Sequence, residues 1–129
     1  MTPELTVLAL AALLQGLQFS LYSATSIAQV GPEKAAGPRD NKIELTGGAG
    51  RLQRALTNHF EGLILFTIAV VVISLGDKGT GFSATCAWTY LIARVLYVPA
   101  YYFGWVPWRS VIWFVGFLST ILMILSALI

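Results

Sequence analysis

The chain has 129 residues, of which 57% are hydrophobic and 11% are charged, and its formal net charge is +2. A soluble domain carries about 25% charged residues, so this composition excludes a soluble multidomain enzyme, a disordered segment and a nucleic-acid binder. The single cysteine, Cys86, excludes a disulfide framework and a multi-cysteine metal site. An integral membrane protein remains.

The first apolar segment covers residues 5–30 and contains no charged residue. About 20 apolar residues cross the hydrocarbon core of a bilayer, so we predict a transmembrane helix over about 4–30. A cleaved signal peptide fits less well, because no basic residues precede the segment and its apolar run is too long. A polar stripe on this helix is expected to make interhelical hydrogen bonds; it consists of Gln15, Gln18 and Tyr22.

Proline, glycine and mixed charges mark residues 31–50 as a loop. The next apolar run, 62–75, is too short to span a membrane unless its helix begins earlier, so we predict a helix over about 50–75. That helix carries four polar residues into or near the membrane: Arg51, Arg54, Asn58 and Glu61.

Two further helices are predicted after the turn signal Gly76-Asp77-Lys78-Gly79, over about 82–103 and 109–129. Short connections favour antiparallel neighbours. The sequence therefore predicts a single domain over residues 1–129, an all-α up-down bundle of four transmembrane helices.

Basic residues predict the orientation of this bundle, because cytoplasmic loops are enriched in lysine and arginine. One side of the membrane carries most of them, and the opposite turn carries only Lys78: the basic side has Lys34, Arg39, Lys42, Arg51, Arg54 and Arg109. We therefore expect both chain termini outside the cytoplasm. The four tryptophans are expected to be interfacial anchors.

The four polar residues of the second helix are spaced three, four and three apart, so they share one face. Ionisable groups at membrane depth face a bundle interior or a wet cavity. One interpretation is structural, with Arg51 or Arg54 paired to Glu61 and capped by Asn58. The other is a ligand site.

The third and fourth helices add further polar groups to the same half of the bundle. Arg94, Tyr97 and Tyr101 share a face, and Arg109 and Ser110 open the last helix, where unpaired N–H groups favour anions. Together these groups suit a small ligand with carboxylates and an amine. His59 lies on another face and is left unassigned, and Cys86 is expected to be a packing residue. The candidate set is Arg51, Arg54, Asn58, Glu61, Arg94, Tyr97, Tyr101, Arg109 and Ser110.

The second helix resembles the signature of the MAPEG family, membrane-associated proteins in eicosanoid and glutathione metabolism. The family pattern Arg-x-x-Arg-Ala-x-x-Asn-x-x-Glu is met by Arg51, Arg54, Ala55, Asn58 and Glu61. Tyr97-x-x-x-Tyr101 and Pro107-x-Arg109-Ser110 look like the end of the family's third helix and the start of its fourth. The resemblance covers the whole chain and looks closest to short bacterial members, which implies a bacterial inner-membrane protein.

The resemblance implies a homotrimeric four-helix bundle that binds glutathione between subunits near the cytoplasmic side. Carried over by position, Arg54, Asn58 and Glu61 would hold the glutathione backbone, Tyr97 and Tyr101 would line the site, and Arg109 would stabilise the thiolate. The implied activity is transfer of glutathione to lipophilic electrophiles, or reduction of lipid hydroperoxides.

This sequence departs from the family's mammalian enzymes, which carry an arginine within the first helix; here residues 5–30 contain none. The position before Asn58 is Thr57, where some members have arginine. A non-catalytic membrane subunit or scaffold with the same fold is therefore the alternative. A transporter fits poorly, because no repeat halves are present.

Overall fold

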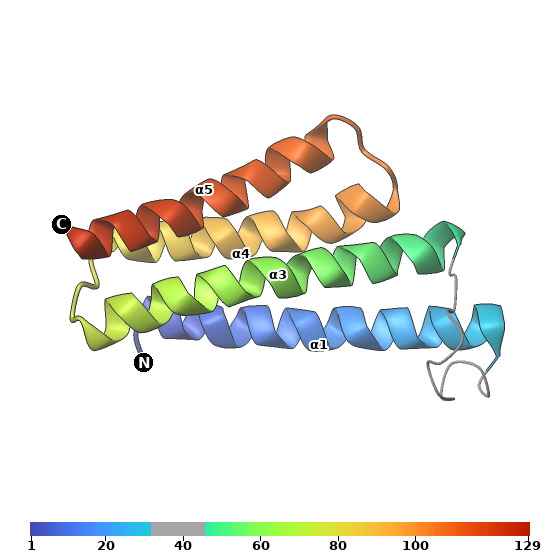
Figure 1. Cartoon of the computed structure of the whole chain (residues 1–129), viewed down its shortest axis with the longest axis horizontal. Coiled ribbons are helices and arrows are strands. Elements are labelled where there is room, and N and C mark those ends of the chain that lie inside the picture. Colours follow the sequence, from blue (N-terminus) through green and yellow to red (C-terminus); the bar gives the residue numbers. More distant parts are fainter. Residues whose placement is uncertain (32–45) are drawn as a thin grey trace.

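The computed structural model describes residues 1–31 and 46–129 of the chain. These residues form four helices: α1 (Pro3–Val30), α3 (Gly47–Leu75), α4 (Gly81–Tyr102) and α5 (Trp108–Leu128). They run side by side, alternating in direction, in a long bundle (Figure 1). The predicted all-α, four-helix architecture is confirmed.

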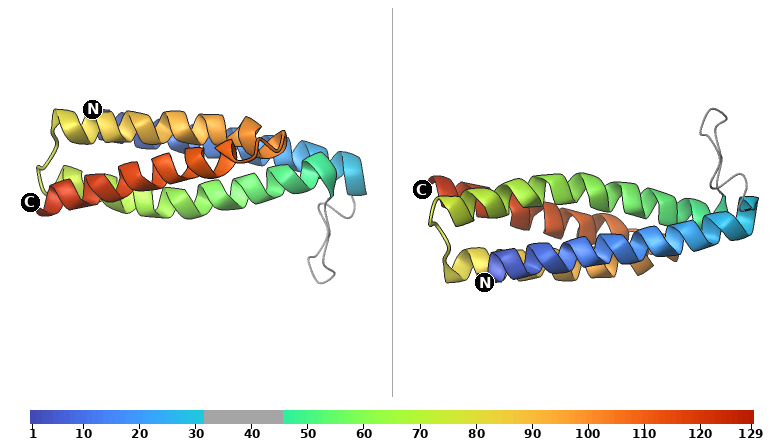
Figure 2. Two further views of the ribbon diagram at one scale, coloured as in Figure 1. Left: turned by 90° about the horizontal axis from the view of Figure 1, so that it is seen from above. Right: turned by 90° about the horizontal axis from the view of Figure 1, so that it is seen from below.

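Helices α1 and α5 each pack against both α3 and α4, and α3 also contacts α4. The views from above and below show the same arrangement (Figure 2). Both termini and the short α3–α4 connection lie at one end of the bundle. The ends of α1 and α4 and the starts of α3 and α5 lie at the other.

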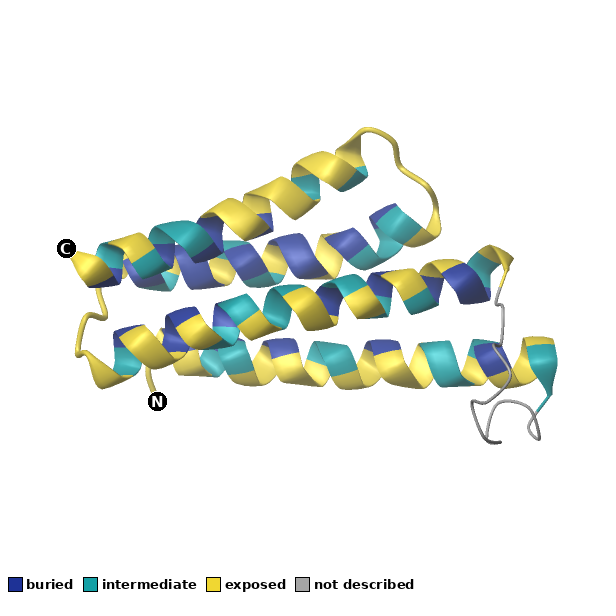
Figure 3. Cartoon of the chain, in the orientation of Figure 1, coloured by how far each residue is buried: buried dark blue, intermediate teal, exposed yellow. Residues whose placement is uncertain are grey.

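Three of the helices are long and apolar enough to cross a membrane: α1 with a mean hydropathy of 1.6, α3 with 1.8 and α5 with 2.4 over their most apolar windows. Helix α4 has 22 residues but is less apolar, because its buried face carries Arg94, Tyr90 and Tyr97. Exposed residues occur along all four helices (Figure 3). Many of them are large and apolar, for example Leu13, Ile68 and Phe114. A surface of this kind suits lipid as the surrounding solvent.

The apolar core lies in the half of the bundle nearer the chain termini. Small residues such as Ala11, Ala69 and Ala87 are fully buried there, which lets the helix backbones approach closely. The rings of Phe66 and Tyr90 stack with their centres 4.0 Å apart and their planes 3° from parallel. Cys86 is buried in this core, as expected for a packing residue.

The expected interhelical hydrogen bonds of the α1 polar stripe are not formed within the part of the chain that the structure describes. Gln18 is 2% exposed, yet both polar atoms of its side chain lack a partner there, as does Oε1 of Gln15. The prediction was wrong for these residues. Gln15 instead lies in a groove lined by apolar side chains of α3 such as Leu63 and Ile64.

Candidate functional site

The predicted site residues gather at the end of the bundle away from the termini, in two groups. The first, which we call the end cluster, consists of Arg51, Arg54, Tyr101 and Arg109. The second, which we call the inner cluster, lies further toward the middle of the bundle. It consists of two predicted residues, Asn58 and Arg94, and two that were not predicted, His59 and Tyr90.

Tyr101 joins three helices in the end cluster. Its hydroxyl accepts a hydrogen bond of 3.1 Å from Nε of Arg54 on α3. The guanidinium carbon of Arg109, from α5, lies 4.9 Å from the centre of the same ring. Cation–π contacts of this length hold a cation at a defined position. Two arginines from different helices are therefore fixed around one half-buried tyrosine.

Arg51 has a structural contact in the same place. Its Nη1 donates a 2.9 Å hydrogen bond to the carbonyl oxygen of Tyr102, in the last turn of α4. Cations stabilise the carbonyl end of a helix in this way. Gly48 makes the approach possible, since a Cβ at that position would lie 2.8 Å from the Tyr102 hydroxyl. Arg51 thus ties the start of α3 to the end of α4.

The start of α5 differs from the expectation in one respect. The backbone N–H of Arg109 donates to the carbonyl of Trp105 at 2.8 Å, and that of Ser110 donates to the carbonyl of Pro107 at 3.1 Å. These two amides are occupied, so the expected anion site at unpaired N–H groups is wrong for them. Ser110 is nonetheless exposed beside Arg109, which keeps its hydroxyl available to a ligand.

Arg94 lies at the centre of the inner cluster and is only 4% exposed. Its Nη1 donates to Oδ1 of Asn58 at 2.8 Å, and its Nε donates to Nδ1 of His59 at 3.3 Å. Its guanidinium carbon also lies 5.0 Å from the ring centre of Tyr97. Because the amide oxygen of Asn58 is occupied by Arg94, the amide nitrogen is the group that Asn58 can offer to a ligand.

His59, like Tyr90, is a residue of this cluster that was not assigned from the sequence. It is fully buried, and its Nε2 lies 3.0 Å from the carbonyl oxygen of Ala11 on α1. A carbonyl only accepts and an arginine Nε only donates, so the ring carries its proton on Nε2 and is neutral. The apolar spacing of Leu52, Ala55 and Phe66 indicates this buried face and was a usable signal.

The predicted acceptor for a ligand's amine, Glu61, is exposed. The hydrogen bonds of Arg51 and Arg54 go to α4 and not to Glu61, so the described residues do not form the paired arrangement that the structural interpretation required. A small cavity of about 190 Å³ lies beside Glu61, between α3, α4 and α5.

Helix length indicates how deep these groups lie. At about 1.5 Å per residue, the roughly 30 Å hydrocarbon core takes up about 20 residues. Counted back from Leu75, the end of α3, that core would begin near Ala55. Arg51 and Arg54 then lie among the lipid headgroups, where arginine is tolerated. Asn58 and Glu61 lie just inside the apolar region.

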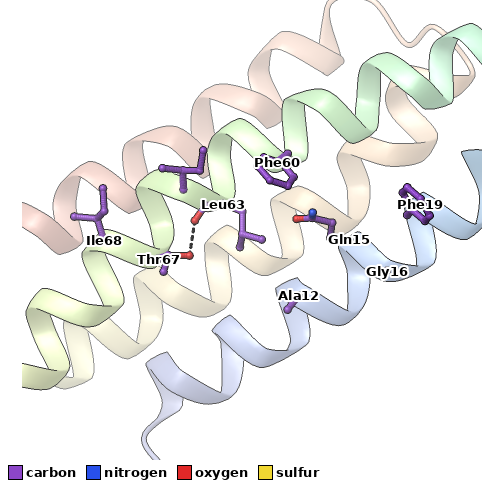
Figure 4. A pocket seen from close by; sticks show the side chains of 9 residues that line it. Ala12, Gln15, Gly16, Phe19, Phe60, Leu63, Thr67 and Ile68 are labelled. Atoms are coloured by element: carbon purple, nitrogen blue, oxygen red, sulfur yellow. Dashed lines mark hydrogen bonds between the residues drawn. The ribbon is translucent and has the colours of Figure 1, made fainter. Parts of the chain in front are cut away.

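A separate apolar groove of about 720 Å³ lies between α1 and α3. Phe19 and Ala12 of α1 line one side, and Phe60 and Ile68 of α3 line the other (Figure 4). Gln15 reaches into this groove from α1 toward α3. The groove and the small cavity share no lining residue, so they are separate hollows against α3.

The fold and the site together define an integral membrane four-helix bundle with arginines and tyrosines gathered at one end. The model of the MAPEG family matches residues 4–129. The chain belongs to the MAPEG family, whose fold is a four-helix membrane bundle and whose members are glutathione-related membrane enzymes. Comparisons with curated proteins and with solved structures found no match.

Proposed function

We propose that the protein is a glutathione-dependent transferase or peroxidase that acts on lipophilic electrophiles or lipid hydroperoxides within the membrane. The observation that carries this proposal is the convergence of Arg54, Tyr101 and Arg109 from three helices at one end of the bundle. Membership of a family that generally binds glutathione supports it.

Different residues of the site suit different chemical groups of glutathione. Arg54 lies at the headgroup level with its Nε on Tyr101, so its terminal nitrogens suit a carboxylate of glutathione. The amide nitrogen of Asn58 suits a peptide carbonyl. The exposed carboxylate of Glu61 suits the amine. Tyr97 and Tyr101 line the site, Ser110 adds a hydroxyl, and Arg51 and Arg94 act as positioning residues through Tyr102 and Asn58.

Arg109 is the proposed catalytic residue. A free thiol has a pKa of about 8.5, and a nearby guanidinium in a water-poor site lowers the thiol pKa of bound glutathione by stabilising the anion. In transfer, the thiolate sulfur bonds to the electrophilic carbon and the leaving group departs with its electron pair. In reduction, the thiolate sulfur takes the distal oxygen of the hydroperoxide, the O–O bond breaks, and the lipid alkoxide leaves and is protonated to the alcohol. The thiol of a second glutathione then attacks the resulting sulfenic acid and gives the disulfide and water.

The test is a thermal unfolding titration of the detergent-solubilised protein with glutathione. A ligand that binds only the folded state stabilises it by RT ln(1 + [L]/Kd), so the melting temperature should rise as glutathione reaches millimolar concentrations. The matched control is oxidised glutathione, which should bind poorly and raise the melting temperature less. A melting temperature that millimolar glutathione leaves unchanged would rule out the proposed transferase activity.

A non-catalytic membrane subunit or scaffold is the second candidate. One observation favours it: Arg51, Arg54 and Arg94 all donate hydrogen bonds to acceptors within their own chain. Under this alternative the same arginines hold the bundle together. Their replacement would lower the melting temperature, and glutathione would have no effect on the wild type.

We further propose that the protein is a homotrimer, with α3 lining the threefold axis and glutathione bound between subunits. Support comes from the family and from the exposed carboxylate of Glu61 on α3, which lies just inside the apolar region and needs burial against a neighbour there. Native mass spectrometry in a mild detergent should give a trimer. Monomers alone would contradict both the assembly and a site between subunits.

The proposed topology in a bacterial inner membrane has both termini outside the cytoplasm and the end cluster inside. This orientation is predicted from the distribution of basic residues. Three of them lie outside the described residues: Lys34, Arg39 and Lys42. Cysteines introduced at Lys42 and Lys78, in a background without Cys86, should be labelled from opposite sides of the membrane. Labelling from one side would refute this orientation.

A further inference from the structure

The cavity between α3, α4 and α5 is lined by a buried arginine whose described hydrogen-bond partners are neutral. It has a volume of about 190 Å³, smaller than the roughly 300 Å³ at which pockets for drug-sized ligands begin. One water needs on the order of 10–15 Å³ of such space. The cavity therefore suits a small ion with some water better than a whole tripeptide.

Two buried polar atoms on residues that line this cavity lack hydrogen-bond partners among residues 1–31 and 46–129. They are Nη2 of Arg94, whose side chain is 96% buried, and the hydroxyl of Tyr90, which is 98% buried; the exposed fractions are 4% and 2%. Both atoms can donate hydrogen bonds, and an arginine nitrogen can only donate. Both donors belong to residues that line one cavity, and because the arginine nitrogen only donates, its missing partner is an acceptor.

The acceptor needs negative charge. The two hydrogen-bond partners that Arg94 has at this site, Asn58 and His59, are both neutral, and the third contact is the Tyr97 ring face. A buried cation is costly unless it is paired with an opposite charge. The carboxylate of Glu61 lines the same cavity, but its side chain is exposed.

Glycines keep room for that acceptor. A Cβ added to Gly62 would lie 3.6 Å from the Tyr90 hydroxyl and 3.7 Å from Nη1 of Arg94, so it would occupy the space in front of both groups. Gly116 faces the same region from α5, where a Cβ would meet Arg94 Cδ at 3.9 Å. These are ordinary contacts, so alanine fits at either position but reduces the cavity.

We propose that this cavity is a binding site for a small monovalent anion, held by Nη2 of Arg94 and the hydroxyl of Tyr90. The anion neutralises Arg94 and thereby fixes the guanidinium that positions Asn58. The negative group is either a free anion from solution or a carboxylate at the end of a larger ligand. The site does not depend on the proposed glutathione chemistry.

The experiment is a thermal unfolding titration of the full chain in detergent, without any thiol, using nitrate and formate as probes. The bulky anion gluconate keeps the ionic strength constant. The wild type should show a saturable rise of melting temperature. Tyr90→Phe keeps the ring that stacks on Phe66 and removes only one donor, so the apparent dissociation constant should rise about tenfold, with Tyr22→Phe unchanged as the matched control.

A second variant keeps the test independent of the tyrosine. Gly62→Ala should also weaken nitrate binding by filling the cavity, whereas Gly16→Ala, where a Cβ meets nothing within 4 Å, should not. Glu61→Gln should tighten nitrate binding by removing a repulsive carboxylate. A wild type without a saturable response, or a response that Tyr90→Phe and Gly62→Ala leave unchanged, would overturn the anion site.

The two sources of the negative group are separated by a glutathione titration of Tyr90→Phe. If a carboxylate of glutathione fills the cavity, its binding weakens in this variant and formate competes with it. If a free anion fills the cavity, glutathione binds equally well to both proteins, and nitrate raises the melting temperature further in its presence. Absence of any glutathione response would count against the proposed function only.

Discussion

The guanidinium of Arg109 lies 4.9 Å from the centre of the Tyr101 ring. This contact holds a half-buried cation of α5 against α4 while its nitrogens remain able to donate to a ligand. Because the Tyr101 hydroxyl also accepts from Arg54, one side chain sets the positions of both arginines. The geometry of the end cluster therefore depends on Tyr101.

Replacement of Arg109 by alanine should slow turnover by about 10²-fold or more, the usual effect of removing a donor that stabilises an anion in the transition state. The thiol pKa of bound glutathione should rise, and glutathione affinity should change little. Rates and the thiolate absorbance as functions of pH measure both. Arg109→Lys is the control and should retain part of the activity; equal loss of binding in Arg109→Ala would contradict the assignment.

Tyr101→Phe removes the hydrogen bond from Arg54 but retains the ring beneath Arg109. We expect weaker glutathione binding, by roughly 1 kcal/mol for one lost hydrogen bond, with a smaller change in kcat. Tyr101→Ala should lower kcat as well, since Arg109 loses its platform. Steady-state kinetics of the two variants test this; identical behaviour would show that the ring contributes nothing.

Glu61→Gln should weaken glutathione binding about tenfold while leaving the melting temperature of the ligand-free protein nearly unchanged. The reason is that the hydrogen bonds of Arg51 and Arg54 go to α4 and not to Glu61, so the amide of similar shape removes neither of these contacts within the bundle. Calorimetric titration and thermal unfolding measure the two effects. A large drop in melting temperature with unaltered binding would support the scaffold instead.

His59→Leu should destabilise the protein. The substitution leaves Arg94 Nε without its partner, and a buried unpaired group costs on the order of 1–3 kcal/mol. It also removes the second hydrogen bond made to the helical carbonyl of Ala11. Unfolding in detergent by a denaturing surfactant should reveal the loss. Phe60→Leu, at an exposed neighbouring position, is the control and should unfold like the wild type.

At the other end of the bundle, Glu4 is buried and its Oε1 is hydrogen-bonded to the hydroxyl of Ser83. Both residues lie in the first turn of their helices, α1 and α4, where a carboxylate is favoured by both helix dipoles. Ser83→Ala should therefore lower the free energy of unfolding by about 1–3 kcal/mol. Thr85→Ala, on the exposed face, should not.

The helices were predictable because charge and apolar runs are strong signals in a membrane chain. The start of α3 was less so: Gly47 and Gly48 were interpreted as loop residues, whereas the helix begins at Gly47 and uses Gly48 to admit the Tyr102 ring. That requirement comes from a residue 54 positions away, and local sequence does not reveal it.

The site was predictable to the level of which residues share a helix face. The roles of single groups were not. Arg94 and Arg109 have equal charge, but the first is buried on Asn58 and the second lies half-exposed on Tyr101. The amides of Arg109 and Ser110 were expected to be available, and the carbonyls of the preceding connection occupy them. Such differences depend on packing between helices.

Both termini lie at the end of the bundle opposite the end cluster (Figure 1). The 29 residues of α3 separate these ends by about 44 Å of helix at about 1.5 Å per residue. A fluorescent fusion or an affinity handle at either terminus would therefore sit across the bilayer from the arginines. Immobilising the protein through such a handle would leave the end cluster facing the solution, which suits direct binding measurements in nanodiscs.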